Sequence, residues 1–309
     1  MKTKVTIVVL AMMISLNACA SNWVELDVLV HEEDGTPVEG ADVKGLFYTD
    51  EIKNGAKRDS HTDITNNEGM AKVAGEEEIY VDLVVSKQGY YPTTKRKVVN
   101  QEKRGLVDVL LRPMRNPIPL YAKTITLEFP QRNYDYEFDF FEGDFVSQGK
   151  GGSHTDVKIR LVRNLIDKEN FTQTAIFTFV SPTDGVVEIE SKDAWKISEF
   201  KTPYLAAIEG YKSKIELKNA RSPEGAFREN LNTPFFVRLR SEVDSDGKIK
   251  TANYCKIFPG IELFGALTDK PLLRMTYYCN PNLNDRNLEF DPQKNLFKDL
   301  KVREQVRKP

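Results

Sequence analysis

The feature that most constrains the fold is a repeated alternation of apolar and polar residues in short runs. In residues 23–30 every second position is Val or Leu, beginning at Val24. Because successive side chains of a strand point to opposite faces, this alternation is typical of a half-buried β-strand. Similar runs, separated by Gly, Pro, Asn and Asp, follow at residues 42–48, 79–86, 95–99 and 106–111. The sequence therefore predicts an all-β fold here.

The rest of the chain continues in the same style. Strand-like runs lie at residues 124–129, 134–140, 157–162, 172–180, 185–190, 214–217, 235–242, 248–258 and 272–279. Spaced strands with turn residues between them predict a second mostly-β domain, a sandwich or a barrel. Short helices are expected only near residues 194–198 and in the charged tail, 295–307.

Four short motifs in the first region together resemble the carboxypeptidase regulatory-like domain. In chain order they are residues 35–43, residues 62–71, Val84-Val85-Ser86-Lys87-Gln88-Gly89-Tyr90 and Val107-Asp108-Val109-Leu110-Leu111-Arg112-Pro113. The resemblance implies a transthyretin-like fold, a seven-stranded Greek-key β-sandwich, and it implies no catalytic residue, since the family is a structural and adhesive module. It places one domain at residues 19–113 and a β-rich domain of unrecognised type at 114–309.

The N-terminus resembles the signal peptide of a bacterial lipoprotein. Lys2 and Lys4 precede an uncharged, mostly apolar run that ends in Leu16-Asn17-Ala18-Cys19, which is similar to the lipobox of that class. The resemblance implies removal of residues 1–18 and attachment of acyl chains, palmitate among them, to Cys19. The alternative is an ordinary signal peptide cut at Ala18-Cys19-Ala20, which would leave Cys19 a third thiol.

Lipidation of Cys19 would make the membrane a partner of the chain. Each buried methylene of an acyl chain contributes about 0.8 kcal/mol, so several chains anchor a protein firmly. Ala20 and Ser21 follow the cysteine, and the Asp that retains enterobacterial lipoproteins at the inner membrane is absent from that position. We therefore expect a location in the cell envelope, with the outer membrane favoured over the inner membrane.

The charge balance argues against nucleic acid as a partner. The chain has 44 basic and 46 acidic residues, for a net charge of -2. Removal of the signal takes away two lysines and no acid, which leaves 42 basic residues against 46 acidic ones and a net charge of about -4. Nucleic-acid binding would call for a basic face, and the sequence gives no sign of one.

Two cysteines remain after Cys19. Cys255 and Cys279 each end a strand-like run. In an oxidising envelope, adjacent strands could bring them together as a disulfide. Two buried free thiols are the alternative, while a metal site is disfavoured because neither cysteine has a histidine or a third sulfur nearby.

Two acidic patterns are candidates for cation binding. Residues 134–140 place four aromatic side chains on one face of a strand and three acids on the other. Acids in that arrangement run parallel, so solvated or cross-strand paired acids are the favoured interpretation. In the loop of residues 280–292, Asp285, Glu289 and Asp291 could converge on a calcium ion. Ordering of the loop by its own side chains is the alternative favoured there.

No catalytic or cofactor motif stands out. The three histidines are His31, His61 and His154, and no His-x-x-Glu or Gly-x-Ser-x-Gly pattern occurs. The glycine-rich run at residues 149–156 does not fit a phosphate-binding loop. We therefore expect no cofactor, no resident metal and no catalysis.

A non-catalytic function by binding or structural attachment follows as the favoured hypothesis. The first version is docking of an envelope protein at exposed sheet edges. The second is polysaccharide binding, in which Trp195, Tyr204 and Tyr211 would stack on sugar rings, unless these aromatics pack internally. An enzyme acting on glycan or peptide remains a third alternative, because so many acids supply candidate pairs.

Overall fold

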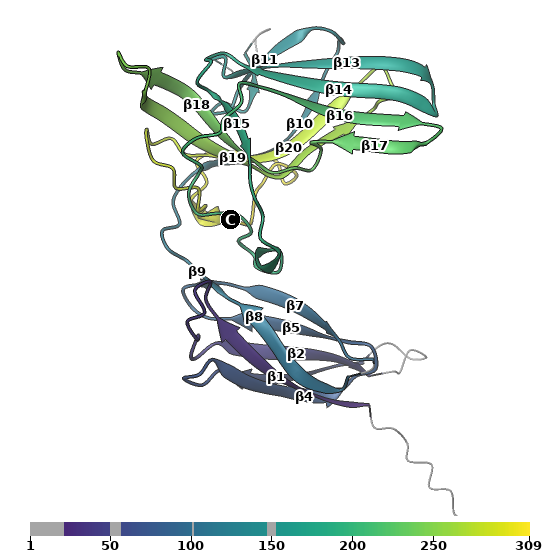
Figure 1. The fold of residues 1–309 in the computed structure, drawn as a ribbon, viewed down its shortest axis with the longest axis vertical. Coiled ribbons are helices and arrows are strands. Elements are labelled where there is room, and N and C mark those ends of the chain that lie inside the picture. Colours follow the sequence, from purple (N-terminus) through teal and green to yellow (C-terminus); the bar gives the residue numbers. More distant parts are fainter. Residues whose placement is uncertain (1–21, 50–56, 101, 147–152) are drawn as a thin grey trace, which may run out of the picture. The chain divides into compact units, whose positions relative to one another are not determined.

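The computed structural model describes residues 22–49, 57–100, 102–146 and 153–309. Its elements are almost all strands, in two compact units (Figure 1). The first unit runs to Ser86 and includes Thr94–Val109, and the second comprises Lys87–Thr93 and Leu110–Pro309. The predicted all-β fold in two domains is confirmed. Cys19 and the signal segment before it lie outside the described residues.

The first unit is built from two sheets. One has the strand order β4-β1-β8, and the other has the order β3-β2-β5-β7. Their bounds are β1 (Trp23–His31), β2 (Asp42–Thr49), β3 (Lys57–Ile64), β4 (Met70–Glu76), β5 (Tyr80–Ser86), β7 (Thr93–Val98) and β8 (Arg104–Leu110). The described part of the unit thus holds seven strands, the number that the family resemblance implies.

The core of the first unit follows the alternation in the sequence. Val24, Leu26, Val28 and Val30 of β1 are all fully buried, while the residues between them are partly exposed. A tight turn at Gly69 joins β3 to β4, with φ at +74° and the Val30 carbonyl oxygen only 2.4 Å from where a Cβ would stand. Only glycine fits both the left-handed backbone and this close approach.

The second unit contains two larger sheets and a short one. The five-stranded sheet has the order β10-β20-β19-β18-β15, and the six-stranded sheet has the order β12-β11-β13-β14-β16-β17. The first comprises β10 (Tyr121–Glu128), β15 (Gly185–Glu188), β18 (Phe235–Val243), β19 (Ile249–Phe264) and β20 (Leu272–Cys279). The second comprises β11 (Asp135–Asp139), β12 (Asp144–Phe145), β13 (Val157–Asp167), β14 (Asn170–Phe179), β16 (Lys214–Ser222) and β17 (Gly225–Glu229). A two-stranded sheet pairs β6 (Tyr90–Tyr91) with β9 (Arg112–Pro113).

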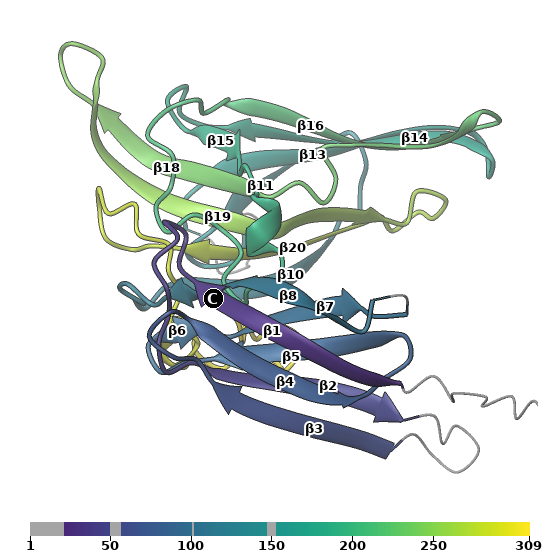
Figure 2. The same cartoon turned by 60° about the horizontal axis from the view of Figure 1, so that its bottom comes forward.

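Figure 2 shows the strands of the two large sheets. These sheets enclose an apolar core, in which aromatic residues of β11 contact Tyr277 of β20. Phe138 and Phe140 pack edge to face against Tyr277, with ring centroids 6.3 and 5.2 Å from it. The five-stranded sheet also buries its other face, against the irregular segments around Ala206 and Phe290. It therefore has buried residues on both sides.

The expected disulfide is present. Cys255 of β19 stands directly opposite Cys279 of β20 in the antiparallel register, and the two sulfurs are bonded inside the sandwich core.

The two helical segments of the described ranges are both shorter than the two that were expected. A 3-10 turn at Asp193–Trp195 overlaps the start of the helix expected at 194–198, and a second turn occupies Pro292–Lys294. Residues 295–307 are irregular, so the predicted helix there is wrong. None of the helical turns in the described ranges has the length or apolar character needed to cross a bilayer.

Candidate functional site

The most unusual local chemistry is a group of buried charges on the outer face of the five-stranded sheet. Arg112 and Lys256 have no exposed surface, and Glu289 is 1% exposed. We call these three residues the buried-charge cluster. All three belong to the second unit, and they come from β9, β19 and the loop after β20.

Arg112 is held by backbone carbonyls and aromatic rings. Its Nη1 donates hydrogen bonds to the carbonyl oxygens of Phe200 and Thr202, both at 2.8 Å. The guanidinium carbon lies 4.4 Å from the ring centroid of Trp195 and 4.7 Å from that of Tyr204. Arginine is the cation best suited to such a place, because its planar charge stacks on aromatic faces and is weakly hydrated.

Glu289 is saturated by donors of the protein itself. Its carboxylate accepts hydrogen bonds from the Tyr91 hydroxyl at 2.8 Å, from Arg115 N at 2.9 Å and from Asn116 N at 2.7 Å. Burial, followed by the bond to Glu289, raises the pKa of Tyr91 above its ordinary value. The carboxylate thereby fixes the two segments by which the chain enters the second unit, around Tyr91 and around Arg115.

Lys256 is buried with few polar contacts. Its Nζ lies 3.3 Å from Thr202 Oγ1 and 4.5 and 4.9 Å from the ring centroids of Tyr278 and Phe200. Burial, and then the charge of Arg112, lowers the pKa of Lys256 to about 7, against the opposing effect of Glu289. Burial thus opposes the charged form of Lys256, in a cluster of two basic side chains and one carboxylate.

The three aromatic residues considered for sugar stacking are covered by protein to different degrees. Trp195 is 6% exposed and Tyr204 is 9% exposed, and both rings face Arg112. Tyr211 is partly exposed, but its hydroxyl donates to the Ala207 carbonyl oxygen and the Arg238 guanidinium lies over its ring. Stacking on a sugar needs an open ring face, so this arrangement favours the alternative of internal packing.

The three acids considered for calcium binding have separate partners. Asp285 Oδ1 accepts a hydrogen bond from Asn287 N, and Asp291 Oδ1 accepts one from Gln293 N. Glu289 belongs to the buried-charge cluster. In the described parts of the chain no group of three or more His, Cys, Asp or Glu side chains is arranged to hold a metal ion. This geometry favours the ordering of the loop by its own side chains.

In the aromatic and acidic strand at residues 134–140, two of the three acids are paired with basic residues of the neighbouring strand, as the favoured interpretation expects. Asp135 pairs with Arg160 at 2.6 Å and Glu137 with Lys158 at 3.3 Å, both across the β11–β13 ladder. Phe138 and Phe140 lie in the core.

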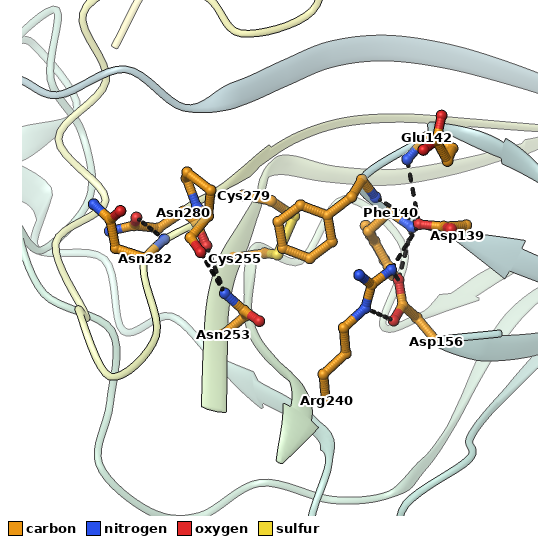
Figure 3. The surroundings of a disulfide bond; sticks show 12 residues. Asp139, Phe140, Glu142, Asp156, Arg240, Asn253, Cys255, Cys279, Asn280 and Asn282 are labelled. Atoms are coloured by element: carbon orange, nitrogen blue, oxygen red, sulfur yellow. Dashed lines mark hydrogen bonds and ion pairs between the residues drawn. A yellow bond between two sulfur atoms is a disulfide. The ribbon is translucent and has the colours of Figure 1, made fainter. Parts of the chain in front are cut away.

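Asp139 departs from this pattern and forms a buried network near the disulfide. Figure 3 shows the guanidinium of Arg240 between Asp139 and Asp156. Arg240 Nη2 donates to Asp139 at 2.9 Å, and its Nε donates to Asp156 at 2.8 Å. Burial raises the pKa of Asp156, although the bond to Arg240 opposes this shift. No sequence pattern predicts this network, because its three members lie far apart in the chain, on separate strands and loops.

A groove runs along the outer edge of β10, the edge strand of the five-stranded sheet. Its volume is about 620 Å³, within the range of ordinary binding sites. Six consecutive residues of β10, Lys123 to Glu128, line it, together with Gly143 to Phe145, Leu272, Arg274, Arg303 and Glu304. We call it the β10 groove. Since both faces of β10 contribute, the groove follows the strand's backbone edge.

The comparisons with known proteins do not place the chain in a family. No protein-family model matches it, and no curated protein does. Among solved structures, a streptococcal ancillary pilin has a TM-score of 0.24 at 10% identity, with 72% of this chain and 54% of the pilin covered, so this chain spans about half of the pilin's length.

Two further likenesses are to bacterial proteins of similar size. A DUF3823 family protein from Parabacteroides merdae ATCC 43184 has a TM-score of 0.23 at 8% identity, covering 81% of this chain and 95% of that one. A candidate carbohydrate binding protein from Bacteroides uniformis ATCC 8492 has a TM-score of 0.21 at 10% identity, covering 85% and 98%. What these proteins bind or assemble is a property of those proteins.

Proposed function

We propose that this chain is a non-catalytic lipoprotein of the cell envelope that binds a partner protein through its second unit. The lipobox-like Leu16-Asn17-Ala18-Cys19 supports the anchor, with the outer membrane as the favoured site. The observation that carries the binding is the β10 groove, because an uncovered strand edge with a cavity beside it accepts an extended chain.

In this proposal the first unit is a carboxypeptidase regulatory-like domain that acts as a structural module between the lipid and the second unit. Its seven described strands in two sheets and the required glycine at Gly69 support the proposal. The buried-charge cluster then has a structural role, which is to fix the chain segments around Tyr91 and Arg115 within the second unit.

The anchor is tested by metabolic labelling with an alkyne analogue of palmitate. Cells producing the full chain or its Cys19→Ser variant are labelled, and inner and outer membranes are separated. We expect label on the wild type alone, in the outer-membrane fraction. Equal labelling of the two proteins, or label on neither, would contradict lipidation at Cys19, while label in the inner-membrane fraction would contradict the location.

Partner binding is tested with a soluble form that lacks residues 1–18 and carries Cys19→Ser. The form is cross-linked in envelope extract, and retained protein and retained polysaccharide are both measured. We expect one reproducible protein partner whose retention is lost after protease treatment of the extract. Retained glycan that survives this treatment would instead support polysaccharide binding, and retention of neither would contradict the proposal.

A further inference from the structure

The C-terminal tail already occupies part of the edge of β10. Asn295 exchanges hydrogen bonds with the backbone of Ala122, its Oδ1 accepting from Ala122 N at 3.2 Å and its Nδ2 donating to Ala122 O at 2.7 Å. Further along, Thr124 N donates to the Glu304 carbonyl oxygen at 2.9 Å. The irregular tail therefore covers the outer edge of β10 as far as Thr124.

Beyond Thr124 the same edge is uncovered. In a strand, alternate residues direct their N–H and C=O groups to the same side. Ala122 and Thr124 point outward to the tail, so Thr126 and Glu128 also point outward, into the β10 groove. Within the described residues no hydrogen bond reaches the N–H or C=O of either residue. Two donors and two acceptors of an edge strand thus face the cavity, and such a row is a template for pairing with another chain.

The charges around the groove favour an acidic occupant. The carboxylates that line the groove already have partners in the protein. Glu128 lies 3.5 Å from Lys270, Glu304 accepts a hydrogen bond from Lys301 N, and Asp144 accepts one from Phe145 N. Arg274 and Arg303 line the groove and form no ion pair with any described residue. Arg274 and Arg303 are therefore open to a ligand, whereas Glu128 has an ion-pair partner and Glu304 and Asp144 each accept a backbone hydrogen bond.

We propose that the β10 groove binds an extended acidic segment of a partner protein, which pairs with the backbone of Thr126 and Glu128 and continues the line of the chain's own tail. Its acidic side chains contact Arg274 and Arg303. This inference rests on the proposed partner-binding function and names the chemistry of the partner. Backbone pairing supplies affinity in this mode of recognition, and the alternating side chains supply specificity.

The test uses the soluble full chain and a fluorescent peptide of alternating valine and glutamate. Three peptides are compared by anisotropy at low ionic strength: the acidic peptide, the same peptide N-methylated at every second residue on its pairing edge, and an alternating valine and lysine peptide. We expect binding of the first only, together with slower hydrogen exchange at the amides of Thr126 and Glu128. Equal binding of the N-methylated peptide, or unchanged exchange at both amides, would overturn the pairing. Equal binding of the lysine peptide would overturn the acidic preference.

Variants of the chain test the same contacts independently. Thr126→Pro removes one outward N–H, at a type of edge position where proline is tolerated. We expect a loss of about tenfold or more in affinity, since one lost bond and the added ring both oppose pairing. The double variant Arg274→Gln with Arg303→Gln should weaken binding and flatten its salt dependence, whereas Lys248→Gln, in an exposed turn away from the groove, should not.

The envelope cross-linking experiment separates the two levels of the proposal. If the wild type and the Thr126→Pro variant retain the same partner equally, the groove assignment is wrong and partner binding stands. If the wild type retains no partner, the proposed function itself fails. Circular dichroism and the native exchange pattern of β19 report whether the proline variant is folded, and the N-methylated peptide gives an answer on the wild type in either case.

Discussion

The two faces of the five-stranded sheet are buried in different ways. The inner face, with Leu273, Met275 and Cys279, packs against the six-stranded sheet through apolar and aromatic side chains. The outer face carries Lys256 among its buried residues and adjoins Arg112 and Glu289. Apolar burial stabilises the folded state in proportion to the apolar area buried. It tolerates exchange of one side chain for another of similar volume. Buried charges depend on particular partners, so the outer layer is specified residue by residue.

Among the variants that test this comparison, removal of Glu289 should cause the largest loss in the free energy of unfolding of the second unit. Glu289→Ala leaves the Tyr91 hydroxyl and the amides of Arg115 and Asn116 without an acceptor, beside the buried Arg112. Breaking a buried charged contact in this way costs about 3–5 kcal/mol. Denaturation in urea, followed by the fluorescence of Trp195 in the second unit, measures this. Leu273→Ala on the inner face is the comparison, at about 2–5 kcal/mol. A loss below about 1 kcal/mol for Glu289→Ala would show that the outer face is not held by its charges.

The disulfide is a covalent bond within the inner face. Its removal should cause the next largest loss of stability. The bond closes a segment with a sequence separation of 24 residues. In the chain-entropy description, a loop of this length stabilises the folded state by roughly 3 kcal/mol. The double variant Cys255→Ala with Cys279→Ala should therefore lower the unfolding free energy of the second unit by a comparable amount. A much smaller change would mean that the paired strands β19 and β20 already impose the restriction that the bond supplies.

Lys256 allows the outer face to be tested through pH. Its pKa is lowered to about 7 by burial, whereas a lysine in the unfolded chain has a pKa of about 10.4. Between these values the unfolded chain holds one more proton than the folded chain, so the free energy of unfolding rises with pH. The expected slope is up to about 1.4 kcal/mol per pH unit between about pH 7 and pH 9.

The control for this titration is Lys256→Met, which keeps the length of the side chain without its charge. We expect a more stable second unit at pH 7 and a shallower slope than in the wild type. Urea denaturation at several pH values gives both slopes. Parallel slopes for the two proteins would show that Lys256 keeps its charge in the folded state, held by Glu289.

The same contrast explains what could be predicted from the sequence. The inner face can be predicted from the sequence, because apolar residues recur at every second position of its strands, as at residues 272–279. Two cysteines at the ends of strand-like runs also suggest a disulfide. The buried charges of the outer face cannot be predicted in this way. Lys256 stands between Cys255 and Ile257, and by alternation it reads as a solvent-facing position. It is buried because segments remote in sequence, around Phe200 and Phe290, cover it.

The hydrogen-bond partners of Glu289 do not follow from its neighbours in the sequence. The sequence grouped it with Asp285 and Asp291, while the structure pairs it with Tyr91 and Arg115, nearly two hundred residues earlier in the first case. The predicted helix in the C-terminal tail is wrong for a related reason. The charges of the tail predict a helix over 295–307, but Asn295 donates to the Ala122 carbonyl oxygen and the Glu304 carbonyl oxygen accepts from Thr124 N, which holds the tail along the edge of β10. Contacts between distant segments override local pattern in both cases.

A pair of buried tyrosines gives the finest test of the two faces and the smallest expected effects. On the inner side, the hydroxyl of Tyr277 is buried without a hydrogen-bond partner among the described residues. Tyr277→Phe removes an unsatisfied polar atom and should change the unfolding free energy by less than about 1 kcal/mol, or raise it. On the outer side, Tyr91 donates to Glu289, and a hydrogen bond to a charged group is worth about 1.5–3 kcal/mol. Tyr91→Phe should therefore destabilise the second unit clearly more than Tyr277→Phe in the same urea series. If the two losses are equal, the polar contacts of the outer face contribute no more than its packing, and the distinction between the faces does not hold.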